Sequence, residues 1–297
     1  MKLSTPLSEK LGLKYPLVCA PMFIISNKEM IVACAEAGIL GTMPSLNART
    51  PEQFRADLAW IRERTDRPFG INLTLGLTPP PRIEADFQAC VEHQVPVLLT
   101  SYGNPTELVR RAHEKKMIVF HDVIGLAHGK KAVAAGVDGI IAVAAGAGGH
   151  AGKVSPFVLV PWLKEELKVP ILAAGCISDG RQVVASLALG ASLCYLGTRF
   201  IASTECGAAD AYKQRVVSAT PDDIVYTDAV SGIHANFLKD TVPEGFQPDR
   251  SPEGAKRWKD IWSAGQGVGQ IHAIKPIGAI VEDLVREAHD TVAALAQ

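Results

Sequence analysis

A run of small residues around a single imidazole is the first place in the chain where chemistry could occur. Residues 144–152 read AAGAGGHAG, and they follow an apolar run at residues 139–143 that is typical of a buried strand. Small side chains let a ligand approach the backbone closely, and glycine permits a positive φ. The imidazole of His150 can transfer protons near neutral pH. We therefore expect a flat or phosphorylated ligand beside His150, although this residue could also be a rim histidine bonded to backbone.

The elements that would position this segment follow a regular rhythm. Eight apolar segments alternate with helical patterns between residues 17 and 198, at a spacing of roughly 25 residues, which is typical of β/α units. The segments are continuously apolar, as expected of parallel strands that are covered on both faces. Eight such units predict an α/β protein with a closed (β/α)8 TIM barrel rather than an open doubly wound sheet.

The rhythm stops after the eighth predicted strand. Residues 205–270 are richer in charge and tryptophan, with a helical pattern at 208–218 and a loop pattern at 245–256, and an amphipathic helix is predicted at 276–295. We expect residues 1–204 and 271–297 to form the barrel, and residues 205–270 to form a small, mostly helical subdomain over the substrate. Its candidate lining residues are Tyr226, His234, Asn236, Phe237 and Trp262. Core packing is the commoner fate of such aromatic residues.

Composition narrows the class of protein. The formal net charge of −1 gives no electrostatic case for nucleic acid or an anionic membrane. The N-terminus lacks the pattern of a signal peptide, and no apolar run has the length of a membrane span. The six cysteines form no CxxC pair and the histidines no metal spacing, so we expect neither a metal site nor a disulfide framework, and a cytoplasmic location. The oligomeric state is left open.

Strand ends are where a barrel places its ligand, and the last two strands end in the most informative residues. Gly175 follows the seventh predicted strand, and Gly197 and Thr198 follow the eighth. Backbone N–H groups at these two ends commonly converge on a phosphate. Because no Walker lysine is present, a phosphate on a cofactor tail fits better than a nucleoside triphosphate. The alternative is that both glycines only close turns.

Four other strand-end residues have polar or reactive side chains. Asn72 could bond a turn or read the edge of a ring through its amide. His121 and Asp122 could form either a structural or a functional pair. Cys176 has no evident base nearby, so we expect an inert thiol rather than a nucleophile.

Several of these segments together resemble the nitronate monooxygenase (2-nitropropane dioxygenase) family. The matching motifs are APM at residues 20–22, FGIN at 69–72, AGGHAG at 147–152, ILAAG at 171–175, LGTRF at 196–200 and WSAGQG at 262–267. The resemblance runs from near residue 10 to about residue 275. The same superfamily includes flavin-dependent enoyl-ACP reductases and NAD(P)H:quinone reductases.

The resemblance implies an FMN-containing TIM barrel and assigns roles to its motif residues. By this likeness His150 corresponds to the catalytic histidine and Ser263 to a serine near the reactive edge of the flavin. The phosphate would be held at Ala174, Gly175, Cys176, Gly197 and Thr198. The ring would lie along Ala20, Pro21, Met22, Asn72, Asp122, Ala145, Gly148 and Gly149.

The chain departs from the family pattern at three places. Cys176 replaces the second glycine of the usual Ala-Gly-Gly phosphate motif, and its Cβ should disfavour a positive φ there. Asp122 stands where some relatives carry lysine, and an anion at the pyrimidine edge should make reduced flavin less stable. The acidic residue that enoyl reductases often place before Gly-Gly-His is absent, which argues against that branch.

The implied activity is oxidation of a nitronate or nitroalkane by O2 to a carbonyl compound and nitrite. His150 would bind the anionic nitro group or remove the α-proton of a neutral nitroalkane. The alternative is an NAD(P)H-dependent flavin reductase that acts on quinones or enoyl thioesters. A third class, a regulatory barrel that only binds a flavin or phosphate, would not require a histidine at the rim.

Overall fold

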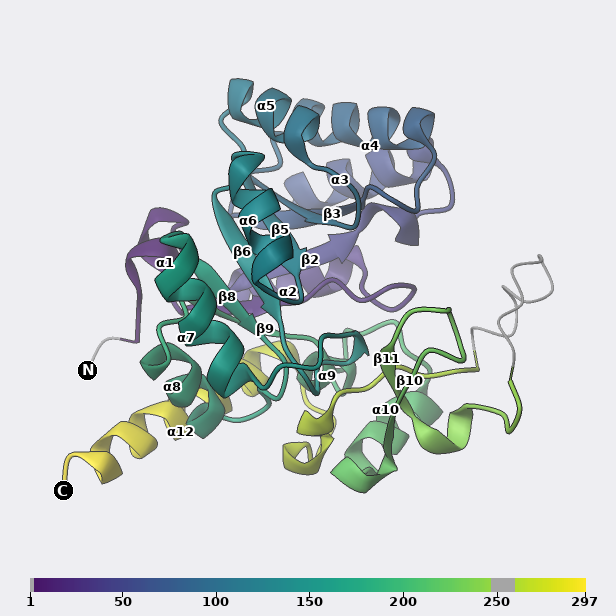
Figure 1. Ribbon diagram of the computed structural model, residues 1–297. Helices are drawn as coiled ribbons and strands as arrows, with labels where there is room; N and C mark the ends of the chain where they lie inside the picture. The colour runs from purple at the N-terminus through teal and green to yellow at the C-terminus, as the bar shows by residue number, and fades with distance from the viewer. Residues whose placement is uncertain (1–2, 247–259) are drawn as a thin grey trace.

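A closed barrel of eight parallel strands forms the centre of the protein. The computed structural model describes residues 3–246 and 260–297, and its barrel order is β1-β2-β3-β4-β5-β6-β8-β9, closed by pairing of β1 with β9 (Figure 1). The strands are β1 (Leu17–Cys19), β2 (Leu40–Pro44), β3 (Phe69–Thr74), β4 (Val97–Ser101), β5 (Ile118–Val123), β6 (Gly139–Val143), β8 (Ile171–Ala174) and β9 (Leu193–Leu196). The fold predicted from the apolar rhythm is confirmed.

Helices connect successive strands and cover the outside of the barrel. They are α2 (Lys28–Ala37), α3 (Pro51–Arg62), α4 (Pro80–Glu92), α5 (Thr106–Glu114), α6 (Leu126–Ala134), α7 (Pro156–Leu167) and α8 (Gly180–Ala188). The short α9 (Thr198–Ile201) follows β9, the last strand of the barrel. Local signals set their ends. Thr50 accepts a hydrogen bond from Gln53 N at 3.2 Å at the start of α3, and Gly38 ends α2 at φ 80°.

The inside of the barrel is apolar and closed at one end. Inward side chains such as Leu99, Phe120 and Leu172 form one buried cluster with Leu7 and Leu11 of the segment that begins with α1 (Pro6–Lys10). Thr5, which caps α1, donates to Ser192 O just before β9 at 2.7 Å, so α1 covers the amino ends of the strands. The carboxyl ends of the strands, where barrels bind ligands, form the opposite mouth.

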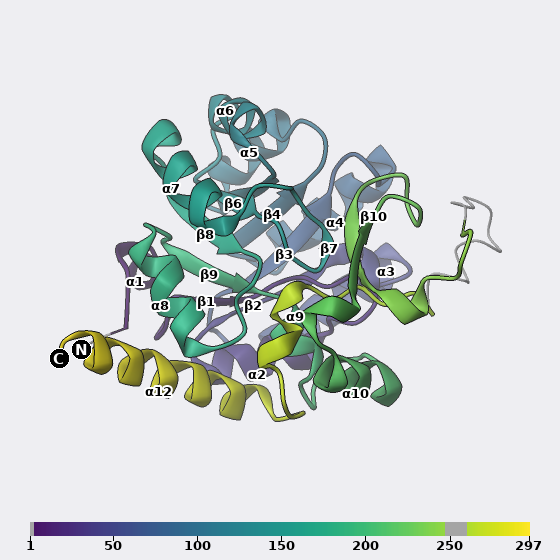
Figure 2. The ribbon, with the colours of Figure 1, turned by 60° about the horizontal axis from the view of Figure 1, so that its bottom comes forward.

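The chain beyond the barrel contributes an antiparallel sheet and a long closing helix. β10 (Ile224–Thr227) pairs with β11 (Ala235–Leu238), which pairs with β7 (Gly149–His150), so the His150 segment forms the edge of a three-stranded sheet (Figure 2). This sheet was not expected from the sequence, whereas the predicted helix at 208–218 is found as α10 (Asp210–Ser218). Most of the predicted loop at 245–256 lies outside the described residues.

The last helix, α12 (Ile277–Leu295), packs against α8 and α2 on the outside of the barrel (Figure 2). Gly180 at the start of α8 permits this packing, because a Cβ there would lie 2.3 Å from Ala288 N. None of the described helices is long and apolar enough to cross a membrane. Within residues 3–246 and 260–297, no three His, Cys, Asp or Glu side chains are grouped so as to hold a metal ion.

Candidate active site at the mouth of the barrel

A chain of polar side chains crosses three neighbouring strands at the mouth. Asn72 of β3 donates from Nδ2 to Ser101 Oγ of β4 at 2.8 Å, and Ser101 donates to Asp122 Oδ2 of β5 at 2.6 Å. Thr74 donates to Asn72 Oδ1 at 3.1 Å. The other carboxylate oxygen, Asp122 Oδ1, is buried and has no partner among the described residues. Burial raises the pKa of Asp122 to about 6, against a lowering effect of the Ser101 hydrogen bond.

His121 does not belong to this network. Successive residues of a strand point to opposite faces, so His121 lies on the outer side when Asp122 lies inside. Its Nδ1 is 2.7 Å from Thr100 Oγ1, and the ring is buried. Burial, with a smaller contribution from His128, lowers the pKa of His121 to about 4. The two residues therefore form no functional pair, and His121 has a packing role.

The imidazole of His150 lies over the mouth. Its ring meets the ring of Tyr102 edge-on, with 5.9 Å between the centroids and 86° between the planes. Tyr102 follows β4 and His150 follows β6, so the contact reaches across β5 in the barrel order. His150 Nε2 is 2.9 Å from Ser231 Oγ, and burial lowers the pKa of the imidazole although the residue keeps solvent-exposed surface.

Tyr102 was not singled out from the sequence. It has φ 58°, which is uncommon for a residue with a Cβ, and its Oη is buried without a partner among the described residues. Burial, and then the charge of Asp122, raises the pKa of Tyr102 to about 12, so the hydroxyl stays protonated. The sequence offers one indication that Tyr102 could belong to the site, namely its position directly after a predicted strand and before Gly103.

The glycines before His150 allow three loops to meet. A Cβ on Gly148 would lie 2.9 Å from Gly265 N and 3.0 Å from Thr198 Oγ1. Gly265 N donates to Thr198 Oγ1 at 2.9 Å, which leaves the threonine hydroxyl proton available to another acceptor. Gly149 has φ 72°, and a Cβ placed on it would meet no described protein atom within 4 Å, so open space lies beside it.

The loop after β8 turns sharply at two residues. Gly175 has φ 114°, and Cys176 has φ 58° even though the sequence led us to expect its Cβ to disfavour a positive value. Cys176 Sγ donates to Ala145 O at 3.5 Å, and burial raises the pKa of the thiol, as expected of an unreactive cysteine. The backbone N–H groups of Cys176 and Ile177 donate to no protein atom in the described part of the chain.

The remaining motif residues border the same mouth. Ala20 N donates to Leu196 O at 2.9 Å, and a Cβ on Gly197 would contact Ala20 and Met22 at 3.7–3.9 Å. Pro21, between them, is half-buried, and Ala174 is the last residue of β8. Ser263 is half-buried; its backbone pairs with Phe237, and its carbonyl accepts from the Tyr212 hydroxyl.

The candidate lining residues of the 205–270 segment have packing or hydrogen-bonding partners. Asn236 donates to Ala147 O at 2.7 Å, and Tyr226 donates to Ala151 O at 2.9 Å, so both support the His150 segment. The ring of His234 lies against that of Tyr226, with 5.0 Å between centroids. Phe237 is buried in a small cluster of its own, and Trp262 stacks on Tyr212 at 5.0 Å.

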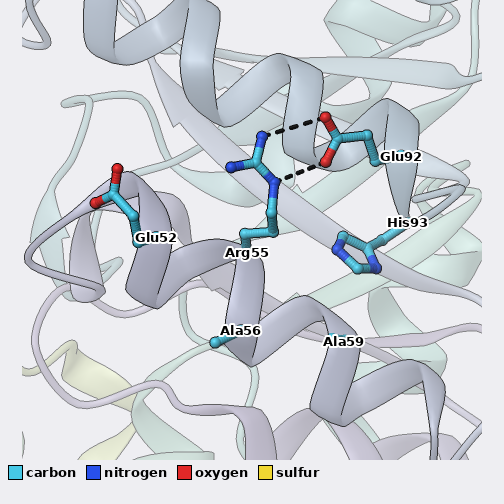
Figure 3. A pocket seen from close by; sticks show the side chains of 6 residues that line it. All are labelled: Glu52, Arg55, Ala56, Ala59, Glu92 and His93. Atoms are coloured by element: carbon cyan, nitrogen blue, oxygen red, sulfur yellow. Dashed lines mark hydrogen bonds and ion pairs between the residues drawn. The ribbon is translucent and has the colours of Figure 1, made fainter.

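A separate hollow lies outside the barrel and does not contribute to this site. Figure 3 shows it between α3 and α4, where Arg55 of α3 pairs with Glu92 of α4 at 2.6 Å. Its lining residues are Glu52, Arg55, Ala56, Ala59, Glu92 and His93. None of them is a predicted site residue.

The residues at the mouth suit a planar ligand with a phosphate tail. Backbone donors without a described protein partner follow β8, open space lies beside Gly149, and an unpartnered acceptor on Asp122 is buried at the mouth. A flavin nucleotide has the matching parts: an anionic phosphate, a flat ring system and a ring N–H donor.

Fold and site together define a (β/α)8-barrel enzyme with one imidazole above glycine-rich loops. The chain belongs to the nitronate monooxygenase family, whose model matches residues 4–247. It is 26% identical to a probable nitronate monooxygenase of Staphylococcus saprophyticus, over 98% of this chain and 99% of that protein. Members of the family are oxidoreductases, and the family implies a flavin cofactor.

Two solved structures share the fold over nearly the whole chain. FabK from Thermotoga maritima has a TM-score of 0.86 and 31% identity, with 98% of each chain covered. Nitroalkane oxidase from Streptomyces ansochromogenes has a TM-score of 0.84 and 25% identity, with 97% of this chain and 99% of that chain covered.

Proposed function

We propose that this oxidoreductase uses FMN to oxidise alkyl nitronates, or the nitroalkanes from which they form, with O2 to a carbonyl compound and nitrite. The observation that carries the proposal is the position of His150, a titratable group above the mouth and beside glycines that leave room for a ring. Family membership and the similarity to a nitroalkane oxidase support the choice of a nitro compound as substrate.

In this proposal the cofactor is held at the ends of β8 and β9, by the loops that follow β1 and β6, and by residues of β3 and β5. Its phosphate accepts from the backbone at Ala174, Gly175, Cys176, Gly197 and Thr198. Its ring lies along Ala20, Pro21, Met22, Asn72, Ala145, Gly148 and Gly149, with Asp122 at the pyrimidine edge. When bound, the flavin supplies the electron transfer from substrate to O2.

His150 is the group that accepts the α-proton of the substrate in this proposal. Because burial lowers its pKa, the imidazole is neutral at neutral pH and is ready to accept the α-proton of a nitroalkane. Ser263 is proposed to lie near the reacting edge, and residues 205–270 are proposed to cover the substrate and set its size.

The rim of the mouth supports a substrate with an alkyl chain. Five large apolar side chains are exposed there, on the loops after β1, β3 and β5 and on the turn between β10 and β11: Phe23, Ile24, Leu77, Ile124 and Ile233. Burying each methylene of a substrate chain against such surface contributes about 0.8 kcal/mol, so affinity should rise from nitroethane to longer 1-nitroalkanes.

The test is aerobic turnover of purified, FMN-loaded protein with a series of 1-nitroalkanes and their nitronates. We expect O2 consumption and matching nitrite release. Absence of nitrite with every member of the series would contradict the proposal.

A reductase remains the second candidate because of the similarity to FabK. It is separated from the first by anaerobic mixing with NADH or NADPH. Rapid loss of flavin absorbance with a nicotinamide would favour the reductase, whereas loss only with the nitro compound would favour the oxidase chemistry.

A further inference from the structure

The Ser231 hydroxyl donates its only proton to a backbone carbonyl. Ser231 lies in the turn between β10 and β11, and its Oγ donates to Ile233 O at 2.9 Å. Ile233 N in turn donates to Ser231 Oγ at 3.3 Å. A hydroxyl has one proton and two acceptor lone pairs, so the contact of 2.9 Å with His150 Nε2 must use a proton on the ring nitrogen.

We infer that Ser231 holds His150 in the tautomer protonated at Nε2, so that Nδ1 is the base that takes the α-proton of a neutral nitroalkane. This inference rests on the proposed function and makes Ser231 a positioning residue, which acts through His150 rather than on the substrate.

No carboxylate of the described chain is bound to the ring of His150. The neutral phenol of Tyr102 meets the ring edge-on, and the charge of Asp122 acts on that phenol. The His234–Asp228 pair lies on the same β10–β11 turn as Ser231, with 3.9 Å between His234 Nδ1 and Asp228 Oδ2. The pKa of His150 is lowered by burial alone. The usual carboxylate that orients a catalytic histidine is therefore replaced by a serine hydroxyl whose own proton points elsewhere.

The tautomer of His150 determines whether the ring can assist the reaction of the neutral nitroalkane or that of the nitronate anion. A neutral ring with its proton on Nε2 presents only a lone pair at Nδ1, so it cannot donate a hydrogen bond from that atom to a nitronate anion. It can accept a proton. The C–H bond of the nitroalkane breaks, its electron pair stays on the nitronate, and the new N–H bond at Nδ1 makes an imidazolium that still donates from Nε2 to Ser231. The pair of His150 and Ser231 therefore favours reaction of the neutral nitroalkane over that of the nitronate.

The tautomer can be measured directly in the FMN-loaded protein. The 15N chemical shifts of labelled histidine, with His150 assigned by comparison with His150→Gln, distinguish a protonated Nε2 from a protonated Nδ1. We expect protonation at Nε2 in the wild type and in Ser231→Thr, and a tautomer mixture in Ser231→Ala. Ser218→Ala removes an exposed hydroxyl that donates to Arg215 O at 3.2 Å, and it serves as the matched control. A wild-type ring protonated at Nδ1 would overturn the inference.

Kinetics provide the second readout. In Ser231→Ala, kcat/KM for a neutral nitroalkane should fall about 2- to 12-fold, the range expected for one orienting hydrogen bond. The value for the preformed nitronate should not change, and Ser231→Thr should restore the loss. Equal effects on both substrate forms, or none on either, would contradict the inference. If neither form is turned over by the wild type, the proposed function fails, and the 15N measurement still decides the role of Ser231.

Discussion

His150 and Tyr102 meet edge-on across the mouth of the barrel, with 5.9 Å between their ring centroids, although Tyr102 directly follows β4 and His150 lies in β7. The contact joins an imidazole with a lowered pKa to a phenol whose hydroxyl is buried and unpartnered among the described residues. Tyr102 has φ 58°, a backbone conformation that costs about 1–2 kcal/mol. Strain of this kind is concentrated at functional sites, which agrees with the location of the proposed chemistry.

The pH dependence of proton abstraction should show the titration of His150. Burial lowers the pKa of His150 below the usual 6.5. We therefore expect kcat/KM for a neutral nitroalkane to be constant at neutral pH and to fall only when the pH drops below this lowered pKa. The fall reflects protonation of the base. Stopped-flow measurement of flavin absorbance across pH 5–8 gives the profile.

The profile needs one control, because Asp122 has a pKa of about 6 and titrates in the same range. Asp122→Asn removes that carboxyl, and the acidic limb should remain. A limb that disappears in Asp122→Asn, or an apparent pKa above 6.5 in the wild type, would be incompatible with His150 as the base.

The buried carboxyl of Asp122 should lower the stability of the flavin-free protein as pH rises. Its pKa is about 6 in the folded state against 3.8 for a free side chain, so the folded state binds more protons between these values. Stability is therefore unaffected below about pH 4 and falls as the pH rises to about 6, by at most about 3 kcal/mol. Urea denaturation at pH 4 and pH 7 measures the difference.

The same comparison in Asp122→Asn isolates this contribution from other titrating groups. The variant should lose less stability than the wild type over that range, by at most about 3 kcal/mol. Identical pH dependence in the two proteins would show that the carboxyl is not held in a site that disfavours its charge.

The open space beside Gly149 can be tested with a matched pair of alanine variants. Gly149 has φ 72° and Gly12 has φ 69°, and neither has a described protein atom within 4 Å of an added Cβ. Both substitutions should lower the free energy of unfolding of the flavin-free protein by about 1–2 kcal/mol. Only Gly149→Ala should weaken FMN binding, by about tenfold or more, because its methyl group enters the space assigned to the ring. Fluorescence titration with FMN measures this, and equal affinities in the two variants would exclude a flavin beside Gly149.

Much of the barrel was predictable because its signals are local. The start of α3 at Thr50 and Pro51 and the end of α2 at Gly38 each depend on residues within one helical turn, so they can be recognised from the sequence. The apolar strands are buried on both faces, which produces the continuous runs that the sequence shows.

The antiparallel sheet was not predictable for the opposite reason. Gly149 and His150 pair with Asn236 and Ala235, more than eighty residues later in the chain, and a glycine-rich strand of two residues has no pattern of its own. The partners of His150 were hidden for the same reason, because Tyr102 and Ser231 reach it only in the folded chain.

The polar network at the mouth was predictable only in part. The strand-end positions of Asn72 and Asp122 follow from the apolar runs that precede them. The hydrogen bonds that join these two residues through Ser101 depend on the register of β3, β4 and β5, which no local pattern reveals.

The most direct test of the central claim is anaerobic mixing of FMN-loaded protein with a neutral nitroalkane, with flavin absorbance as the readout. We predict that wild type loses the absorbance of oxidised flavin within the turnover time, and that His150→Asn retains FMN but reacts about 10²- to 10⁴-fold more slowly. The exposed His128→Ala variant should react like the wild type. A protein that binds no FMN, or a His150→Asn variant that is reduced as fast as the wild type, would contradict the proposed chemistry.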